Sequence, residues 1–264
     1  MCLIAWHWQP GAPEPLVLLS NRDEFFNRPA RTLQRWFDAP IWAGRDELAG
    51  GTWLGVGVSG RMAAITNYRS MHSSNELAKS RGHMVRDFLL SHLSALDYAA
   101  YVAQNASAYN PFNLWLFDGQ SMMGVQGRHS QSKVVTLTPG YGSVSNADFN
   151  SPWPKQLQLQ AQLRTLIESG HAADDTLLDL LRNTQTTQLG DLPQTGVAPE
   201  KELALSAMFV RLSDYGTRAS TLVRYGLEIV RMKERSFDAQ GQLNACVAEA
   251  RVPRAPHAHQ VHRI

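Results

Sequence analysis

The opening of the chain decides the fold, and it reads CLIAWHWQPGAPEPLVLLSNRDE over residues 2–24. Residues 2–8 form an apolar, aromatic-rich run that is typical of a strand, and residues 9–15 carry the glycine and prolines of a turn. Residues 16–19 form a second apolar run, which ends in a polar cluster at residues 20–24. Because a hairpin of this length returns the end of its second strand to the start of its first, we expect residues 21–23 to lie close to Cys2.

Cys2 directly follows the initiator methionine, so removal of Met1 would leave a cysteine with both a thiol and a free α-amine. The amine has a reference pKa of about 7.7–8.0 and the thiol one of about 8.5, so the two groups can exchange a proton near neutral pH. A terminal amine that acts as base for its own side chain is a known means of activating a nucleophile. The alternative is that Cys2 is a small buried residue that opens a strand.

Composition narrows the class of protein. Of the 264 residues, 44% are hydrophobic and 18% are charged, so the chain can bury a substantial core. The net charge of +2 gives no electrostatic case for binding nucleic acid. Two cysteines, Cys2 and Cys246, do not make a disulfide framework and favour a reducing compartment. With neither a signal-peptide pattern nor an apolar run of about 20 residues, we expect a cytoplasmic protein without stable membrane insertion.

The remaining elements are predicted from hydrophobic period and turn residues. Six glycines between residues 44 and 60 match neither a P-loop nor a dinucleotide-binding motif, and we interpret them as tight turns between antiparallel strands. Helices are predicted within residues 80–94, at 96–104, and twice within 152–181. Strands are predicted within 41–68 and at 113–117, 122–126, 134–137, 143–145, 207–212, 219–225 and 228–236, with turns at 215–216 and 225–226. Residues 183–202 are predicted to be an exposed loop.

The order of these elements indicates an α+β fold. Helices cluster between groups of hairpins and do not alternate with single strands, so two antiparallel sheets with helices on their outer faces would bury both apolar sets. No linker composition divides the chain, so a single domain is predicted over residues 1–250. Residues 251–264 are predicted to be a flexible tail. Its His257, His259 and His262 are spaced so that they could hold a metal, but a disordered tail is the preferred interpretation and no metal site is predicted.

A nucleophilic Cys2 would need partners. An attack on an acyl carbon requires a group that orients the α-amine, donors for the oxyanion, and positive charge near the thiolate. The hairpin returns Asp23 to the amine. Asn67 and Asn146 each follow a short strand and are candidate oxyanion donors, and Arg218 between the closing strands is a candidate source of fixed charge. Taken singly, an asparagine at a strand end is more often a turn former, and an isolated arginine is usually a solvated surface charge.

Candidate binding residues lie in the same segments. Arg22, Glu24 and Arg28 either bind an anionic headgroup or form a structural network of salt bridges, which is the commoner arrangement. Trp53 and Tyr68, with four other tryptophans of the strands, either line an apolar acyl pocket or belong to the core. The candidate substrate-binding residues are Asn21, Arg22, Trp53 and Tyr68.

Together these motifs resemble the NRDE family, also called the transport-and-Golgi-organisation-2 family. The resemblance runs from Met1 to about Arg235 and rests on Cys2, Asn21-Arg22-Asp23-Glu24, Gly50-Gly51-Thr52-Trp53-Leu54-Gly55, Thr66-Asn67-Tyr68-Arg69 and Ser80-Arg81-Gly82. It implies an N-terminal-nucleophile hydrolase fold, a four-layer αββα sandwich in which two antiparallel sheets lie between helical layers.

The family is in turn distantly similar to the bile-salt and penicillin V acylases, whose processed N-terminal cysteine attacks an amide. This similarity implies that Cys2 is the nucleophile and Asp23 the carboxylate near the amine. It likewise implies that Asn67 and Asn146 form the oxyanion hole and that Arg218 is the late arginine near the nucleophile.

One position departs from the acylase pattern. Those enzymes carry an arginine three residues before the aspartate, where this chain has Ser20. Arg22 precedes Asp23 directly, so on a strand it points to the opposite face from Asp23. We therefore expect that Arg22 does not simply replace the missing arginine.

The sequence thus predicts a cysteine N-terminal-nucleophile hydrolase that cleaves an amide or thioester with a hydrophobic acyl group and needs no cofactor. The alternative is a non-catalytic carrier, since the resemblance links eukaryotic relatives to haem trafficking and to lipid or acyl-CoA homeostasis; haem would then be a ligand. The predicted partner is a small-molecule acyl substrate or haem and not nucleic acid. The chain carries no signal for an oligomeric state.

Overall fold

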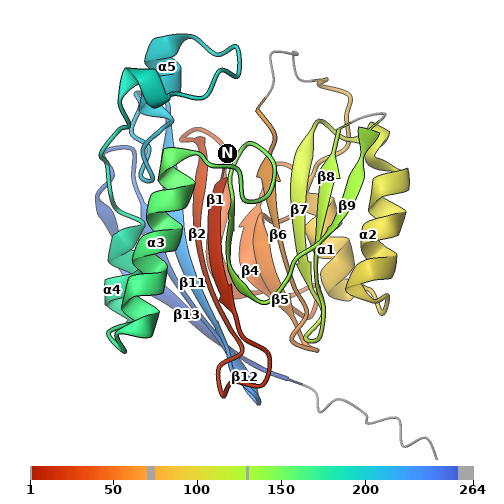
Figure 1. Ribbon diagram of the computed structural model, residues 1–264. Helices are drawn as coiled ribbons and strands as arrows, with labels where there is room; N and C mark the ends of the chain where they lie inside the picture. Colours follow the sequence, from red (N-terminus) through yellow and green to blue (C-terminus); the bar gives the residue numbers. More distant parts are fainter. Residues whose placement is uncertain (1, 70–74, 129–130, 255–264) are drawn as a thin grey trace, which may run out of the picture.

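Two antiparallel sheets face each other and carry helices on their outer sides (Figure 1). The computed structural model describes residues 2–69, 75–128 and 131–254. The first sheet contains β1 (Cys2–Trp8), β2 (Leu16–Phe25), β10 (Gly140–Val144), β11 (Tyr215–Tyr225), β12 (Ile229–Phe237) and β13 (Leu243–Pro253). Its strand order is β10-β1-β2-β11-β12-β13, so the opening hairpin occupies the middle of the sheet.

The second sheet is a meander whose strands follow one another in chain order. It contains β3 (Ala30–Arg35), β4 (Ile41–Asp46), β5 (Leu54–Gly57), β6 (Met62–Asn67), β7 (Phe112–Phe117), β8 (Met122–Gly127) and β9 (Lys133–Thr136). Helices α1 (Gly82–Leu90) and α2 (Ala95–Gln104) pack on this sheet. Helices α3 (Pro154–Glu168) and α4 (Asp174–Leu180) pack on the first sheet, and the short α5 (Pro199–Ala204) stands at one end (Figure 1). The predicted four-layer αββα sandwich is confirmed.

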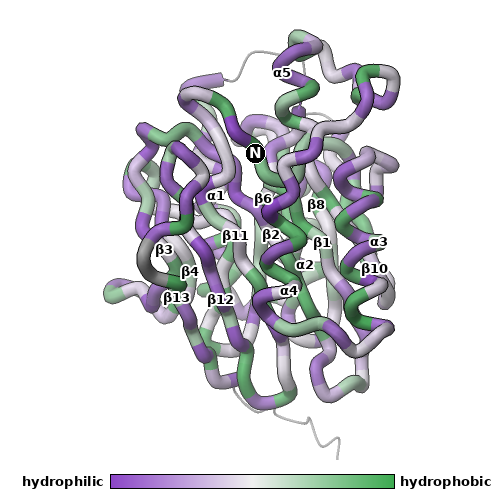
Figure 2. Tube along the Cα trace, turned by 90° about the vertical axis from the view of Figure 1, so that its left-hand side faces the viewer, coloured by the Kyte–Doolittle hydropathy of each residue, from purple (hydrophilic) through white to green (hydrophobic). Residues whose placement is uncertain are grey.

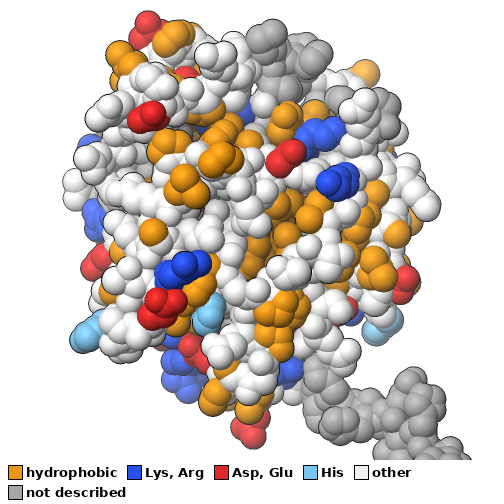
Figure 3. Space-filling model, in the orientation of Figure 1, with side chains coloured by type: hydrophobic (Ala, Val, Ile, Leu, Met, Phe, Trp, Pro, Cys, Tyr) orange, Lys and Arg blue, Asp and Glu red, His pale blue; other side chains and the backbone are white. Residues whose placement is uncertain are grey.

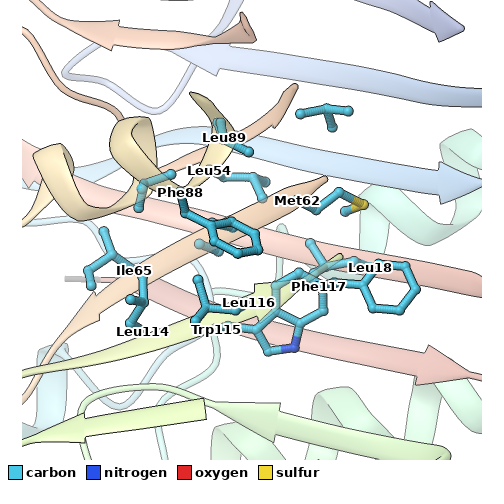
Figure 4. Packing of buried hydrophobic residues seen from close by; sticks show 14 of the residues in the cluster. Leu18, Leu54, Met62, Ile65, Phe88, Leu89, Leu114, Trp115, Leu116 and Phe117 are labelled. Carbon is cyan, nitrogen blue, oxygen red and sulfur yellow. The ribbon is translucent and has the colours of Figure 1, made fainter. Parts of the chain in front are cut away.

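Strand β1 shows why the sheets are buried on both faces. Ile4 and Trp6 pack into the cluster between the sheets, whereas Leu3 and Ala5 pack against α3 and α4. A strand covered on both sides has no polar face, which explains its unbroken apolar sequence. Figure 2 shows hydrophobic residues along β1 and β2, and Figure 4 shows the core between the sheets, where Leu18 of β2 lies near Trp115 and Phe117 of β7.

Several predicted elements differ from the structure. Residues 207–212 form no strand; they follow α5 as irregular chain, because Val210 packs against Leu205 and Tyr215 in a small separate cluster. Strand β11 begins at Tyr215, so the turn predicted at 215–216 lies inside a strand. Edge strand β3 was not predicted because only Leu33 of its six residues is buried. Strand β13 was also missed and continues to Pro253, past the expected boundary at residue 250.

The predicted exposed loop at 183–202 contains structure of its own. It holds a short 3-10 turn (Leu189–Asp191) and most of α5, and the side chain of Glu202 is buried. The burial of this carboxylate ties the segment to the rest of the protein. The tail histidines at 257, 259 and 262 lie outside the described residues.

The glycine-rich block between residues 44 and 60 serves close packing as well as turns. Gly50 and Gly60 adopt positive φ, as a turn requires. Gly51 instead lies against the backbone of Gly82, where an added Cβ would sit 2.5 Å from the carbonyl carbon of Gly82. This contact of backbone on backbone brings residues 80–82 next to the loop before β5, so the interpretation of these glycines as turns was only partly right.

The surface carries both signs of charge. On the face shown in Figure 3, basic and acidic side chains are interspersed, in keeping with the net charge of +2. Within the described residues, no helix is long and apolar enough to cross a bilayer.

Candidate functional site

The β1–β2 hairpin presents its motif residues on two opposite faces. Cys2 pairs with Arg22, and Leu3 pairs with Asn21, in one antiparallel register. Paired residues share a face and successive residues alternate, so Cys2 and Arg22 point toward the second sheet, whereas Asn21 and Asp23 point toward the layer of α3 and α4. The predicted approach of residues 21–23 to Cys2 is confirmed.

A cavity of about 710 Å³ opens at this end of the sandwich, next to the start of β1. Five of the nine candidate site residues line it: Cys2, Arg22, Asp23, Trp53 and Asn67. Further wall residues come from the loop before β5, from residues 75–82 and from residues 212–215. Phe25, Trp53 and Ile65 supply apolar surface, so the cavity joins an apolar wall to a strongly charged one.

Four charged residues on the cavity side form a set that we call the front group: Arg22, Glu24, Arg28 and Arg81. The Arg22 guanidinium lies 4.2 Å over the ring of Trp53 and 3.9 Å from Glu24. Arg28 pairs with Asp46 at 2.7 Å and lies 3.9 Å from Glu24. Arg81 donates a 3.1 Å hydrogen bond to the carbonyl of Pro111. The salt-bridge interpretation of the tetrad thus holds, and these same charges border the cavity.

Arg22 lies on the face opposite Asp23, as expected. Ser20 and Arg22 are two residues apart on one strand, so both lie on the face opposite Asp23 and on the same face as Cys2. The position three residues before Asp23 therefore shares its face with Arg22. Arg22 supplies a guanidinium directly across from Cys2, although the arginine of the acylase pattern is absent at Ser20.

The Cys2 thiol is nearly enclosed. Burial raises its pKa; the N-terminal charge lowers that pKa, Asp23 raises it and Arg22 lowers it. The hydroxyl of Ser145 donates to the carbonyl of Cys2 at 3.1 Å and holds the start of β1 against the end of β10. A buried thiol is a poor nucleophile at neutral pH, so nearby positive charge decides its reactivity.

Behind the hairpin lies a second set of charges, which we call the rear cluster: Asp23, Arg69, Lys155 and Glu202. All four side chains are buried. Arg69 is ion-paired with Glu202, which also accepts a 2.6 Å hydrogen bond from the hydroxyl of Thr195. The Nζ of Lys155 donates to the carbonyl of Leu205 at 2.9 Å. Strand β2, the segment after β6, α3 and α5 each contribute one member.

Asp23 is held from strand β11. The Thr217 hydroxyl donates to Oδ1 of Asp23 at 2.7 Å, and the Tyr215 hydroxyl donates to the Asp23 carbonyl at 2.8 Å. Burial raises the pKa of Asp23, while the N-terminal charge, Lys155, the hydrogen bond from Thr217 and Arg69 lower it. These contacts orient the carboxylate beside the start of β1.

The two strand-end asparagines have different surroundings. Asn67 is half-buried and lines the cavity, and its side chain makes no hydrogen bond with other described residues. Asn146 is buried, lies outside the cavity wall and donates to the carbonyl of Asn67 at 2.8 Å. Its Oδ1 accepts from Arg69 at 3.4 Å and from Ser145 at 3.2 Å. Asn67 is thus free to reach a ligand, whereas Asn146 fixes the backbone that carries it.

Three other candidates do not line the cavity. Asn21 donates to the carbonyls of Leu181 and Met208 and so anchors the helical layer. Tyr68 stacks under Arg128, with the guanidinium 3.5 Å from the ring centre. Arg218 donates to the carbonyls of Phe25 and Arg28 and braces the chain after β2.

Sequence reasoning missed several residues of the site. Arg81, Tyr215, Thr217 and Lys155 received no role. The segment that holds Arg81 carried a signal. Its neighbour Gly82 and the distant Gly51 are both glycines, as a close contact between two backbones requires. The run YGTRAST over residues 215–221 carried another, since small polar residues in a buried strand indicate internal hydrogen bonds. Lys155, a single lysine in a polar helix, carried none.

The described residues show no metal centre. No group of three or more histidine, cysteine, aspartate or glutamate side chains gathers among them, and none of their histidines lines the cavity. The donors at the cavity are guanidinium, ammonium, amide and hydroxyl groups, a set suited to acyl and anionic groups, and its carboxylates are acceptors.

Comparison with known proteins identifies the family. The sequence model described as "Transport and Golgi organisation 2" matches residues 1–238. The Bos taurus Transport and Golgi organization protein 2 homolog is 34% identical over 247 residues, covering 84% of this chain and 88% of that protein. The Mus musculus homolog is 30% identical over 243 residues, with the same shares covered.

Two solved structures share the fold at low identity. A Caenorhabditis elegans N-acylethanolamine-hydrolyzing acid amidase ortholog is 11% identical with a TM-score of 0.50, covering 83% of this chain and 91% of that one. A variant of the conjugated bile acid hydrolase from Clostridium perfringens is 9% identical with a TM-score of 0.50, covering 95% and 92%. Both likenesses concern the N-terminal-nucleophile hydrolase fold alone. On its motifs, its fold and the match over residues 1–238, the chain belongs to the Transport and Golgi organisation 2 family.

Proposed function

We propose that this protein is a cysteine N-terminal-nucleophile hydrolase that cleaves an amide or thioester with a hydrophobic acyl group in the cytoplasm. The observation that carries the proposal is the position of Cys2. It stands at the first position of β1, lines a cavity of about 710 Å³, and has Arg22 across from it and Asp23 beside it. Removal of Met1 would place an α-amine on the same residue as the thiol.

The chemistry follows from these residues. The α-amine of Cys2 accepts the thiol proton, and the thiolate attacks the substrate carbonyl to form a tetrahedral oxyanion. The side-chain N–H of Asn67 stabilises that oxyanion, and the positive charge of Arg22 favours the thiolate. The resulting ammonium returns its proton to the departing amine or thiol, which leaves an acyl thioester on Cys2.

Water completes the cycle. The α-amine accepts a proton from water, hydroxide attacks the thioester carbonyl, and Cys2 leaves as a thiol with the proton returned. Asp23, which the Thr217 hydroxyl holds in place, orients the amine in both steps. The apolar wall of Phe25, Trp53 and Ile65 is suited to the acyl chain, and the front group to a polar leaving group.

The test begins with the chemical state of the N-terminus. Intact-mass measurement of purified protein is expected to show Met1 removed, and treatment with an acyl electrophile is expected to add one acyl group to Cys2. Cys2→Ala should abolish both the adduct and hydrolysis of N-acyl amides and acyl thioesters, whereas Cys246→Ser should leave them unchanged. Retention of Met1 in protein that turns over substrate would overturn the mechanism.

A non-catalytic carrier of haem or of an acyl ligand is the alternative. The size and opening of the cavity favour ligand binding of either kind, and a Cys2 thiolate would be the ligand for haem iron, because none of the described histidines lines the cavity. Titration with haem that gives a Soret band lost in Cys2→Ala, together with no hydrolysis of any acyl substrate, would favour the carrier.

A further inference from the structure

Lys155 stands in a position that is unfavourable for a lysine in three ways. Its side chain is 5% exposed, and among the described residues no carboxylate lies within ion-pair distance of its Nζ. It also occupies the first turn of α3, after Pro154 at the start of the helix. Cations are disfavoured there because the helix N-terminus is itself positive. Burial lowers the pKa of Lys155 from 10.5 to about 8, as expected for an ammonium removed from water.

Its surroundings show what the charge acts on. Leu205, whose carbonyl accepts the bond from Lys155, packs in one cluster with Tyr215, and the Tyr215 hydroxyl donates to the Asp23 carbonyl. The charges of Asp23 and Glu202 and the Cys2 thiolate raise the pKa of Lys155, and the charge of Arg69 lowers it. The hydrogen bond from Lys155 to Leu205, at the end of α5, fixes the ammonium in this place. Lys155 therefore lies on the buried side of the hairpin and is not one of the residues that line the cavity.

We propose that Lys155 is a positioning residue that acts through Asp23: its ammonium keeps Asp23 ionised and holds the amine and thiol of Cys2 in their reactive protonation states. This inference rests on the proposed function of Cys2 and adds the group that tunes it. A buried aspartate beside an α-amine would on its own favour the ammonium, which cannot accept the thiol proton. A second cation behind the aspartate offsets that field and also favours the thiolate.

The charge of Lys155 acts on both titratable groups of Cys2. Loss of its charge would raise the pKa of the α-amine, because the ammonium would no longer be repelled. It would also raise the pKa of the Cys2 thiol, because the thiolate would lose an attractive neighbour. Iodoacetamide reacts with the thiolate, so the rise in the thiol pKa moves the midpoint of alkylation upward. The amine change offsets part of that shift, because an amine that stays protonated to higher pH favours the thiolate beside it.

The experiment measures alkylation of Cys2 by iodoacetamide against pH. Full-length protein is prepared with Cys2 at its N-terminus by cleavage of a leader peptide. The Cys2 and Cys246 adducts are separated by mass after digestion with trypsin. Lys155→Met is compared with Lys155→Gln, with Lys155→Arg, and with Lys133→Met, which removes the same charge from the distant strand β9. Thermal unfolding confirms that each variant is folded.

Lys155→Met and Lys155→Gln should each move the midpoint of Cys2 alkylation upward by about one pH unit and lower the rate at pH 7 about tenfold. Lys155→Arg and Lys133→Met should stay close to the wild-type profile. A profile unchanged in folded Lys155→Met or Lys155→Gln would overturn the proposal. So would a shift in Lys155→Arg as large as in Lys155→Met, because the side chain would then act through packing. Alkylation needs no turnover, so a protein that hydrolyses nothing would contradict the proposed hydrolase without affecting this result.

Discussion

The front group and the rear cluster lie on opposite faces of the same hairpin and differ in how far their charged side chains are exposed to water. In the front group, Arg28 is 30% exposed, Glu24 24% and Arg22 5%, and all three border a cavity. In the rear cluster, Arg69 and Glu202 are 5% and 3% exposed, and the Arg69 guanidinium lies 5.2 Å over the ring of Trp153. Charges that border water can adapt to a ligand, whereas buried charges depend on fixed neighbours. Substitutions in front should therefore change binding and catalysis, and substitutions behind should change stability and protonation.

The largest effect is expected from the buried ion pair. Arg69→Met should lower the free energy of unfolding by about 3–5 kcal/mol, because it leaves the Glu202 carboxylate buried without its guanidinium. The measurement is urea-induced unfolding at pH 7. The double variant Arg69→Met, Glu202→Met should recover a large part of the loss, because it removes both charges; a double variant as unstable as the single one would show that packing, not charge, holds this region.

The next largest effect is expected at Asn67, which lines the cavity. Asn67→Ala should lower kcat/KM about 10²–10³-fold, the usual cost of losing one oxyanion donor. Its free energy of unfolding should change by less than about 1 kcal/mol, since no described residue depends on its side chain. Asn105→Ala at the end of α2 provides the matched control. Equal loss of activity in both variants would remove Asn67 from the oxyanion hole.

Replacement of Lys155 should stabilise the protein at pH 7, whereas replacement of Arg69 should destabilise it. Its pKa of about 8 in the folded protein lies below the value of 10.5 expected when it is unfolded, so the unfolded chain binds the extra proton between these two pH values. The free energy of unfolding therefore rises as pH increases from about 8 to 10.5. Below pH 8 the protein bears the full cost of burying the Lys155 ammonium. Lys155→Met should stabilise the protein at pH 7 by about 2 kcal/mol, after the lost hydrogen bond to Leu205 is included.

Unfolding curves of wild type and Lys155→Met at pH 7 and pH 10 test this sign. The gain should shrink at the higher pH, because the wild-type lysine is then largely neutral. A variant that is destabilised at both pH values would show that Lys155 contributes to stability, and that its charge carries no folding cost.

The smallest effect is expected for Arg28 of the front group, whose side chain is partly exposed to water. Arg28→Gln removes the 2.7 Å pair with Asp46, yet it should cost less than about 1 kcal/mol of stability, because a partly exposed pair is screened by water. Urea-induced unfolding at two salt concentrations measures it. A cost as large as that of Arg69→Met would erase the distinction between the two sides of the hairpin.

The parts of the fold that could be predicted are those in which local pattern and burial agree. β1 is buried along its whole length, so its apolar run was sufficient. β3 has one buried residue in six, and at the edge of the sheet the strand is specified by its pairing with β4. Residues 207–212 show the reverse error, since Val210 and Leu212 pack in a small cluster, Met208 packs under the first sheet, and the segment forms no ladder.

The part of the site that could be predicted is the part that the β1–β2 hairpin forms, because a hairpin pairs residues that are close in the sequence. Sequence alone determined that residues 21–23 return to the start of β1 beside Cys2, because strand pairing across a short turn fixes the register. Only the tertiary structure decided which strand-end asparagine reaches the cavity, that Arg218 braces a loop, and that Lys155 lies behind Asp23. These residues are more than 40 positions from the hairpin, and their approach depends on how two sheets and two helices pack, which no local period records.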